Sequence, residues 1–381
     1  GMRVVRLWIL GEHPAELEWL DDAVDRVLDM GCIPLVCIDG YVNGSTVYSM
    51  DDPDVLSSQW TAASWRSYVE QLASRYYGKV THWEILNEPW AYSADQFMGV
   101  LTNTAPMIKD IDPTAIIHGP AQALGDSTLA LMEQCARAGL FNYIDVADYN
   151  AYYPVADDSF RLEALRDLVG SYADGRSEAL QPLERYIPST NCPVWMTEYY
   201  KAPSVAASGL VEEPEYNAMA HIGIKMIQAR AHGVSKFVLF HSSPWGMASG
   251  IMGYGMGRSA TGPAASPAYL AAAAGAEQLT GLRLNRVWNR NSLFLYGFGP
   301  PGTSSVTHVA AWTPMRGETV EIDAWLPAAI ERVRLDGSRQ ILPANTALSV
   351  NDRPCFLVDE TGQYDWTALF GGVGEVIPYP N

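Results

Sequence analysis

The sequence predicts an α/β fold, a TIM (β/α)8-type barrel followed by a small C-terminal antiparallel β-sandwich module. From residue 1 to about 282, short apolar runs alternate with segments whose apolar residues recur at helical spacing, which is typical of βα units around a parallel sheet. From residue 283 to 381 the runs are short and alternating, and turn residues such as Asp336-Gly337 separate them. We therefore expect a barrel domain over residues 1–282 and a β-sandwich domain over residues 283–381.

Seven strands are expected in the first part, whereas closing a barrel of this type takes eight. The expected strands are Arg3–Leu10, Ile33–Asp39, Val80–Leu86, Ala115–Gly119, Tyr143–Asn150, Pro193–Thr197 and Lys236–His241. The expected helices are Leu17–Met30, Ser64–Tyr77, Ser93–Asp110, Ser127–Ala138, Leu162–Tyr172, Glu215–His232 and Ala268–Leu279. Strands expected in the second part include Leu293–Gly297, Val306–Trp312, Thr319–Ile322 and Cys355–Val358.

Charge and composition narrow the classes of function. The 25 Lys and Arg residues against 43 Asp and Glu residues give a net charge of −18, which repels nucleic acid and anionic membranes and favours a neutral ligand. The five cysteines have no metal-site spacing, and no sequence motif predicts a metal or cofactor. No run reaches the roughly 18 apolar residues that span a bilayer. We expect a soluble protein, cytoplasmic or secreted, whose oligomeric state the sequence leaves open.

Two strand ends carry carboxylic acids. The strand Val80–Leu86 runs into Asn87-Glu88-Pro89-Trp90, and the strand Pro193–Thr197 runs into Glu198-Tyr199. In a barrel, active sites are built on the rim at the carboxyl ends of the strands. Cleavage of a glycosidic bond needs two carboxyl groups, about 5–5.5 Å apart for retention of anomeric configuration and roughly 6.5–9.5 Å apart for inversion. Each Glu alone could instead cap a helix or pair with an Arg.

The two motifs together resemble clan A of the glycoside hydrolases, over about residues 2–282. In that clan the acid/base follows an Asn at the end of the fourth strand, and the nucleophile ends the seventh. Asn87-Glu88-Pro89 and Thr197-Glu198-Tyr199 match these positions. The resemblance implies an oligosaccharide or glycoside substrate, a β-linkage and a retaining double displacement, with Glu88 as acid/base and Glu198 as nucleophile.

Weaker matches occur in the same order along the chain. Arg6 matches a second-strand Arg that holds the nucleophile in this clan, although a purely structural ion pair is an equal alternative. Asn150-Ala151-Tyr152 stands where the family usually has His-x-Tyr, so Tyr152 matches the partner of the nucleophile and Asn150 is a departure. Trp245 matches the aromatic floor of the sugar subsite. Aligned in this way, Arg3–Leu10 is the second strand, and the first strand is absent from the sequence.

Among clan members the chain is most similar to the family 39 type of β-xylosidases and related enzymes. Gly119-Pro120-Ala121, the run from Tyr149 to Pro154 and the trailing β module carry this similarity. The segment from Leu348 to Leu357 resembles the closing strand of the family's β-sandwich.

Other residues complete the candidate site. Trp90 and Tyr199 follow the catalytic positions and are expected to line the cleft, and Asn87 and His118 are candidates to bind sugar hydroxyls, with a structural role as the alternative for the histidine. Glu84 lies four residues before Glu88 and faces the same way at period two, so it is a second candidate acid.

Two other functions remain open. A barrel that binds carbohydrate without cleaving it would keep the same cleft. An aldolase or isomerase would need a Schiff-base lysine or a phosphate site at the strand ends. The chain has only Lys79, Lys109, Lys201, Lys225 and Lys236, and none is expected at such a position.

Overall fold

A computed structural model gives the architecture of most of the chain. The residues that it describes are 4–9, 14–39, 62–89, 92–123, 126–151, 155–176, 189, 191–199, 212–239, 267–290, 293–313, 319–362, 364–370 and 375–376.

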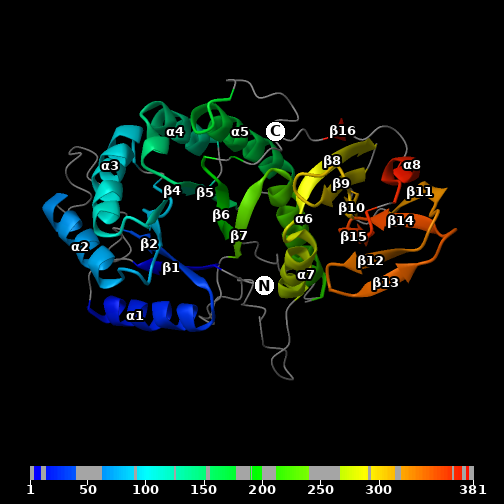
Figure 1. Ribbon diagram of the computed structural model, residues 1–381, viewed down its shortest axis with the longest axis horizontal. Coiled ribbons are helices and arrows are strands. Elements are labelled where there is room, and N and C mark those ends of the chain that lie inside the picture. Colours follow the sequence, from blue (N-terminus) through cyan, green and yellow to red (C-terminus); the bar gives the residue numbers. More distant parts are fainter. Residues whose placement is uncertain are drawn as a thin grey trace.

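The first part of the chain is a curled parallel sheet surrounded by helices (Figure 1). Within the described residues seven strands pair in chain order. They are β1 (Val4–Ile9), β2 (Ile33–Ile38), β3 (His82–Ile85), β4 (Ile116–Ala123), β5 (Val146–Ala151), β6 (Val194–Tyr199) and β7 (Val234–Leu239). The helices are α1 (Pro14–Asp29), α2 (Ala62–Arg75), α3 (Ala94–Ile111), α4 (Asp126–Arg137), α5 (Val155–Tyr172), α6 (Glu212–Ala231) and α7 (Pro267–Leu279). The predicted barrel-type fold and its βα order are confirmed.

The sheet curls until β1 and β7 approach each other, but in the described part of the chain no ladder of hydrogen bonds joins them. The gap in the predicted strand count therefore falls between these two edges. That the absent strand is the first one of the family barrel stays a prediction.

The two faces of the barrel strands differ in character, because successive side chains of a strand point to opposite sides. Outward-facing residues such as Leu7, Val36, Trp83 and Ile117 join the large apolar cluster under the helices. The inward-facing positions of β1, β3, β4 and β5 instead include the polar residues Arg6, His82, Glu84, His118, Asp148 and Asn150. The polar groups are thus concentrated inside the barrel, beneath the rim where the candidate site lies.

The second part of the chain forms two antiparallel sheets. A seven-stranded sheet has the order β13-β12-β15-β10-β9-β8-β16, and β11 pairs with β14 in a two-stranded sheet. The strands are β8 (Arg283–Arg290), β9 (Leu293–Gly299), β10 (His308–Trp312), β11 (Thr319–Trp325), β12 (Ile330–Arg334), β13 (Arg339–Leu342), β14 (Ala347–Asn351), β15 (Cys355–Val358) and β16 (Glu375–Val376). Short helices are η1 (Leu140–Asn142) in the barrel and α8 (Trp366–Phe370) here.

One detail of the sandwich corrects the sequence analysis. The segment from Leu348 to Leu357, which resembles a single closing strand, contains two strands, β14 and β15, that belong to different sheets. A turn at 351–353 separates them, where the backbone N–H of Arg353 donates to Oδ1 of Asn351 at 3.1 Å. This segment therefore carries the chain from one layer of the sandwich to the other.

The larger sheet of the sandwich is buried on both faces. Leu295, Val309 and Leu357 pack toward the two-stranded sheet, whereas Phe298 and Phe356 pack toward the barrel helices. Figure 1 shows α6 and α7 between the barrel sheet and this large sheet. Because one apolar cluster is shared across this contact, division of the chain into domains at residue 282 stays a prediction.

The contact between α6 and the sandwich is tight enough to require a glycine. A Cβ added to Gly223 would lie 2.7 Å from Cδ2 of Leu335 and closer still to Cδ1, and Leu335 is almost fully buried. Further along, Nε of Arg230 near the end of α6 donates to the carbonyl of Leu282 at 2.9 Å, which anchors the segment leading into the sandwich.

We predict opposite effects for the same substitution at two helical glycines. Gly223→Ala should lower the free energy of unfolding by about 1–2 kcal/mol, because overpacking outweighs the gain in helix propensity. Gly99→Ala in α3, where an added Cβ meets nothing within 4 Å, should raise it by up to ~1 kcal/mol. Denaturant unfolding of both variants measures this. Equal stabilisation by both would contradict the tight contact.

Candidate active site

The backbone after β3 turns sharply at the rim of the barrel. Leu86 and Glu88 both have positive φ, 65° and 44°, a conformation that costs a non-glycine residue of order 1–3 kcal/mol and marks positions held by their surroundings. The backbone N–H of Leu86 donates to Ile38 O at 2.9 Å, and that of Glu88 donates to Ala121 O at 3.1 Å. The turn is thus fixed to strands on both sides.

The helix that follows this turn has a complete N-terminal cap. The backbone N–H of Gln96 donates to Oγ of Ser93 at 3.2 Å, and the backbone N–H of Ser93 donates to Oε1 of Gln96 at 2.9 Å. Such a capping box satisfies two backbone N–H groups at once and fixes where α3 begins. The turn carrying Glu88 therefore lies between two ordered elements.

Asn150 connects the candidate acid/base to the neighbouring strand. Its Nδ2 donates to Oε1 of Glu88 at 2.9 Å, and its Oδ1 accepts from Oγ1 of Thr197 at 3.3 Å. The carboxyl group of Glu88 is half-buried, whereas Asn150 is fully buried. In the β5–β6 ladder Asn150 pairs with Glu198. The residue that departs from the family pattern thus contacts Glu88 directly and pairs through its backbone with the other candidate carboxylate.

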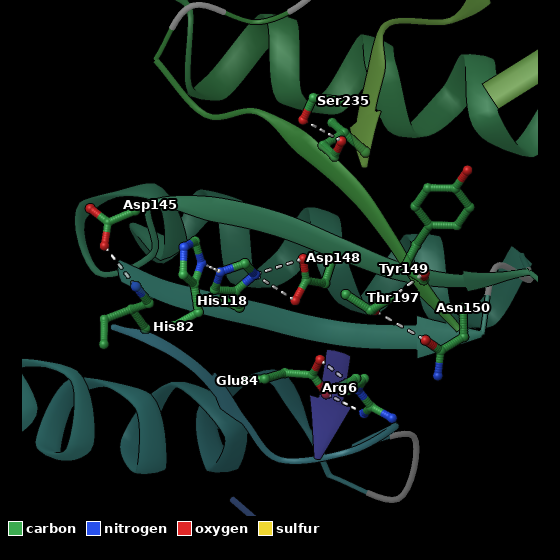
Figure 2. A network of polar contacts seen from close by, with 12 residues as sticks. Arg6, His82, Glu84, His118, Asp145, Asp148, Tyr149, Asn150, Thr197 and Ser235 are labelled. Carbon is green, nitrogen blue, oxygen red and sulfur yellow. Dashed lines mark hydrogen bonds and ion pairs between the residues drawn. The ribbon is translucent and has the colours of Figure 1, made fainter. Parts of the chain in front are cut away.

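A buried ion pair lies beneath this rim. Nε of Arg6 donates to Oε2 of Glu84 at 2.9 Å, and Nη2 donates to Oε1 of the same carboxylate, so the two groups meet as a fork (Figure 2). Nη2 also donates to Oδ1 of Asn87 at 2.8 Å. With its oxygen engaged, the Asn87 amide keeps its N–H groups as donors at the rim.

The network of polar side-chain contacts continues deeper into the barrel. Nδ1 of His118 lies 3.0 and 3.1 Å from the two carboxyl oxygens of Asp148, and Nε2 of His118 lies 2.8 Å from Nδ1 of His82 (Figure 2). Burial lowers the pKa of His118 to about 3 and that of His82 to about 4, so both rings are neutral at ordinary pH. Trp195 stacks on His82 with ring centroids 5.1 Å apart, at the His82 end of this network.

Two carboxyl groups meet in this interior. Asp148 is fully buried, and burial followed by the charge of Glu84 raises its pKa well above the usual range. The thiol of Cys37 lies beside the same Glu84, and burial raises its pKa as well. The described interior side chains therefore form a buried, connected polar network.

The structure brings together several of the residues predicted from sequence. Two hydrogen-bonded pairs, Arg6 with Asn87 and Asn150 with Glu88, meet where Asn87 and Glu88 follow each other at the rim. Arg6 is bonded to Glu84 and Asn87, and its predicted contact with the nucleophile stays a prediction. His118 is fully buried with both ring nitrogens engaged inside the protein, which favours the structural alternative for the histidine.

Other predicted residues fall outside the described part of the chain. They are Trp90, Tyr152 and Trp245. For Glu198 and Tyr199 the backbone of β6 is described and the side chains are not. The roles of these residues stay predictions.

Sequence reasoning missed three residues that make polar contacts in the barrel interior or at its rim. Asp148 and His82 were not singled out, nor was Trp8, whose Nε1 donates to Oδ2 of Asp39 at 3.1 Å near the end of β1. A signal for Asp148 and His82 exists in the sequence. Polar residues alternate with apolar or aromatic ones in His82-Trp83-Glu84-Ile85 and in Asp148-Tyr149-Asn150-Ala151, although buried parallel strands usually read as continuous apolar runs.

Neither a metal site nor a Schiff-base site appears among the described residues. They contain no group of three or more His, Cys, Asp or Glu side chains arranged to hold a metal ion. Lys79 and Lys109 form surface ion pairs, and Lys236 is the third residue of β7, with Nζ 6.0 Å from the Trp195 ring centroid. Lys225 lies within α6. None of these four lysines ends a strand. No helix in the described ranges is long and apolar enough to cross a membrane.

Comparison with known proteins supports the fold. No family sequence profile matches the chain, and no curated protein sequence does. Among solved structures, it is similar to a family 39 glycoside hydrolase from the gut symbiont Bacteroides cellulosilyticus WH2, with a TM-score of 0.66 and 16% identity over 94% of this chain and 75% of that one. It is also similar to the catalytic domain of a family 30 xylanase C from Talaromyces cellulolyticus, with a TM-score of 0.59 and 15% identity over 94% and 88%.

A third similar structure is a glucosidase from Croceicoccus marinus, with a TM-score of 0.53 and 13% identity over 93% of this chain and 88% of that one. The chain thus shares its barrel-plus-sandwich fold with these glycoside hydrolase structures. The predicted similarity to family 39 is confirmed at the level of the fold.

The histidine pair predicts how stability depends on pH. The folded-state pKa of His82 lies below the usual value of about 6.5, so the unfolded state binds more protons between pH 6.5 and 4, and stability is lost as pH falls through that window. His82→Asn keeps a donor for His118 but cannot titrate. Between pH 6.5 and 4 the wild type should lose roughly 3 kcal/mol relative to this variant in denaturant unfolding. Parallel losses in the two proteins would contradict the assignment.

Proposed function

We propose that this chain is a retaining glycoside hydrolase that cleaves β-glycosidic bonds by double displacement, with Glu88 as the general acid/base and Glu198 as the nucleophile. One observation carries the proposal. The carboxyl group of Glu88 stands on the rim of the barrel, held by Asn150, whose backbone partner on the next strand is Glu198. The fold shared with a family 39 glycoside hydrolase, a xylanase and a glucosidase supports it.

The proposed reaction has two steps. Glu198 attacks the anomeric carbon while Glu88 gives its proton to the glycosidic oxygen, so that the leaving group departs as an alcohol and a glycosyl ester forms on Glu198. Glu88, now ionised, removes a proton from water, which attacks the anomeric carbon and releases Glu198. Two inversions at the same carbon leave the anomeric configuration unchanged.

Asn150 supports the role of Glu88 by fixing one of its two oxygens. Because Nδ2 of Asn150 donates to Oε1, the carboxyl group cannot rotate freely, and Oε2 is the oxygen left to carry the proton that is transferred. Asn87 adds N–H donors at the same rim, since Arg6 occupies its oxygen. Donors of this kind suit the hydroxyl groups of a sugar.

Hydrolysis of aryl β-glycosides and oligosaccharides, with product anomers followed by NMR, tests the proposal. The wild type should release the β anomer first. Glu198→Ala should lose activity on every substrate by more than about 10⁴-fold, and Glu88→Ala by about 10²–10⁴-fold where the leaving group needs a proton. A 2,4-dinitrophenyl glycoside needs none, so Glu88→Ala should still form the glycosyl ester from it, and added azide should give a β-glycosyl azide.

Glu133→Ala is the matched control, because Glu133 is a surface residue of α4 that is paired only with Arg137 four residues away. This variant should keep wild-type rates. Near-normal turnover by Glu198→Ala would refute the nucleophile, and an inverted first product would refute retention. Sugar binding without turnover across the panel would favour the carbohydrate-binding barrel.

Asn150 gives a separate prediction. Asn150→Ala should lower kcat by about 10–100-fold with little change in KM, since it removes a hydrogen bond of about 1.5–3 kcal/mol to the carboxyl group. Asn150→His, which supplies the family's residue and retains an N–H donor, should recover most of that loss. Steady-state kinetics on one aryl glycoside measures both variants, and an Asn150→Ala variant as active as the wild type would contradict the assigned contact.

A further inference from the structure

Among the described residues of the interior network, the carboxyl groups of Glu84 and Asp148 are in contact, and Arg6 supplies a guanidinium. Glu84 is bonded through both oxygens to Arg6, and Asp148 is hydrogen-bonded to Glu84. All three side chains are almost fully buried. Two ionised carboxylates have no proton to share, so a hydrogen bond between these groups requires that one of them is protonated.

The surroundings decide which carboxyl group holds that proton. Glu84 accepts two N–H donors from a cation that cannot lose its charge, which favours its ionised form. Among the described residues, no Lys or Arg side chain is hydrogen-bonded to Asp148, although the charge of Arg6 acts on it. Its neighbour on β4 is His118, a neutral ring, and Cys37 on β2 and Cys192 before β6 contribute only thiols.

The direction of each hydrogen bond follows from this placement. A protonated Asp148 donates its O–H to Glu84 and accepts from Nδ1–H of His118, whose Nε2 then accepts from Nδ1–H of His82. In this series of hydrogen bonds, each donor group points toward Glu84. The reverse arrangement, with an ionised Asp148 and a charged His118, would place two buried anions in contact and add a buried cation.

We propose that Asp148 is a positioning residue that holds the single proton of the Glu84–Asp148 pair, keeps Glu84 anionic for Arg6 and so keeps Arg6 fixed on Asn87. The positioning part rests on the proposed function, because the orientation of Asn87 affects turnover only if this rim binds the substrate. The location of the proton does not depend on it.

Infrared difference spectroscopy locates the proton without any need for turnover. At pH 8 the wild type should show the C=O stretch of a protonated carboxylic acid that shifts in D₂O, and Asp148→Asn should lack it. Asp145→Asn is the matched control on the same segment, because Asp145 is ion-paired with Lys109 at the surface, and this variant should keep the band. Absence of the band from the wild type, or its survival in Asp148→Asn, would overturn the proposal.

Two isosteric variants test the positioning role. Asn in place of Asp148 can donate to Glu84 and accept from His118, so Asp148→Asn should stay within about 3-fold of the wild-type kcat/KM, whereas Asp148→Ala should fall by about 10–100-fold. Glu84→Gln should be as damaging as Asp148→Ala, because an amide cannot balance the charge of Arg6. If the proton were on Glu84, the tolerated variant would be Glu84→Gln and the damaging one Asp148→Asn, which would refute the assignment.

The outcomes separate this proposal from the proposed function. If Asp148→Ala fails to fold, comparison of Asp148→Asn with Glu84→Gln still shows which of the two carboxyl groups holds the proton. Should the wild type lack glycosidase activity, the band and the unfolding midpoints of the same pair decide where the proton lies, with Glu84→Gln expected to be the less stable variant.

Discussion

The ion pair of Arg6 and Glu84 ties β1 to β3 inside the barrel, and the placement of the candidate site depends on it. The pair lies one layer below the rim, with the Asn87 amide bonded to it from above and Asp148 in contact from the side. Breaking a buried pair by removing one partner typically costs about 3–5 kcal/mol, because the remaining charge is left without compensation. A polar barrel interior of this kind stabilises one arrangement of the rim only while all its members are present.

The turn at Glu88 shows how the fold and the site depend on each other. Two adjacent strands accept hydrogen bonds from its backbone, and the strain at Leu86 and Glu88 persists because those bonds hold it. At the end of a regular strand, the direction of a glutamate side chain is set by the alternation of the strand alone. Here the direction of the side chain is set by bonds to β2 and β4 and by the amide of Asn150.

Much of the fold could be predicted from the sequence, because repeated βα units leave a strong periodic signal. Asn87, Glu88 and Asn150 were also within reach, since each lies close to the end of a strand. The contact between Asn150 and Glu88 was not, because it joins residues 62 positions apart and depends on how far the sheet curls. The partner of Arg6 was open for the same reason. In the sandwich, the run from Leu348 to Leu357 gave no sign that its two strands belong to different sheets, since periodicity within a strand does not show which strand it pairs with.

The large sandwich sheet is covered on one side by α6 and α7 and on the other by the two-stranded sheet. Separation of the sandwich from the barrel would therefore expose apolar surface on both parts. A fragment that stopped before β8 would expose the apolar surface around Gly223 to water, and the isolated sandwich would expose Phe298 and Phe356. Exchange of this module for that of another barrel would therefore require a matching redesign of both helices. The two parts are expected to have changed together during divergence, with the fit at Leu335 limiting which sandwiches this barrel can carry.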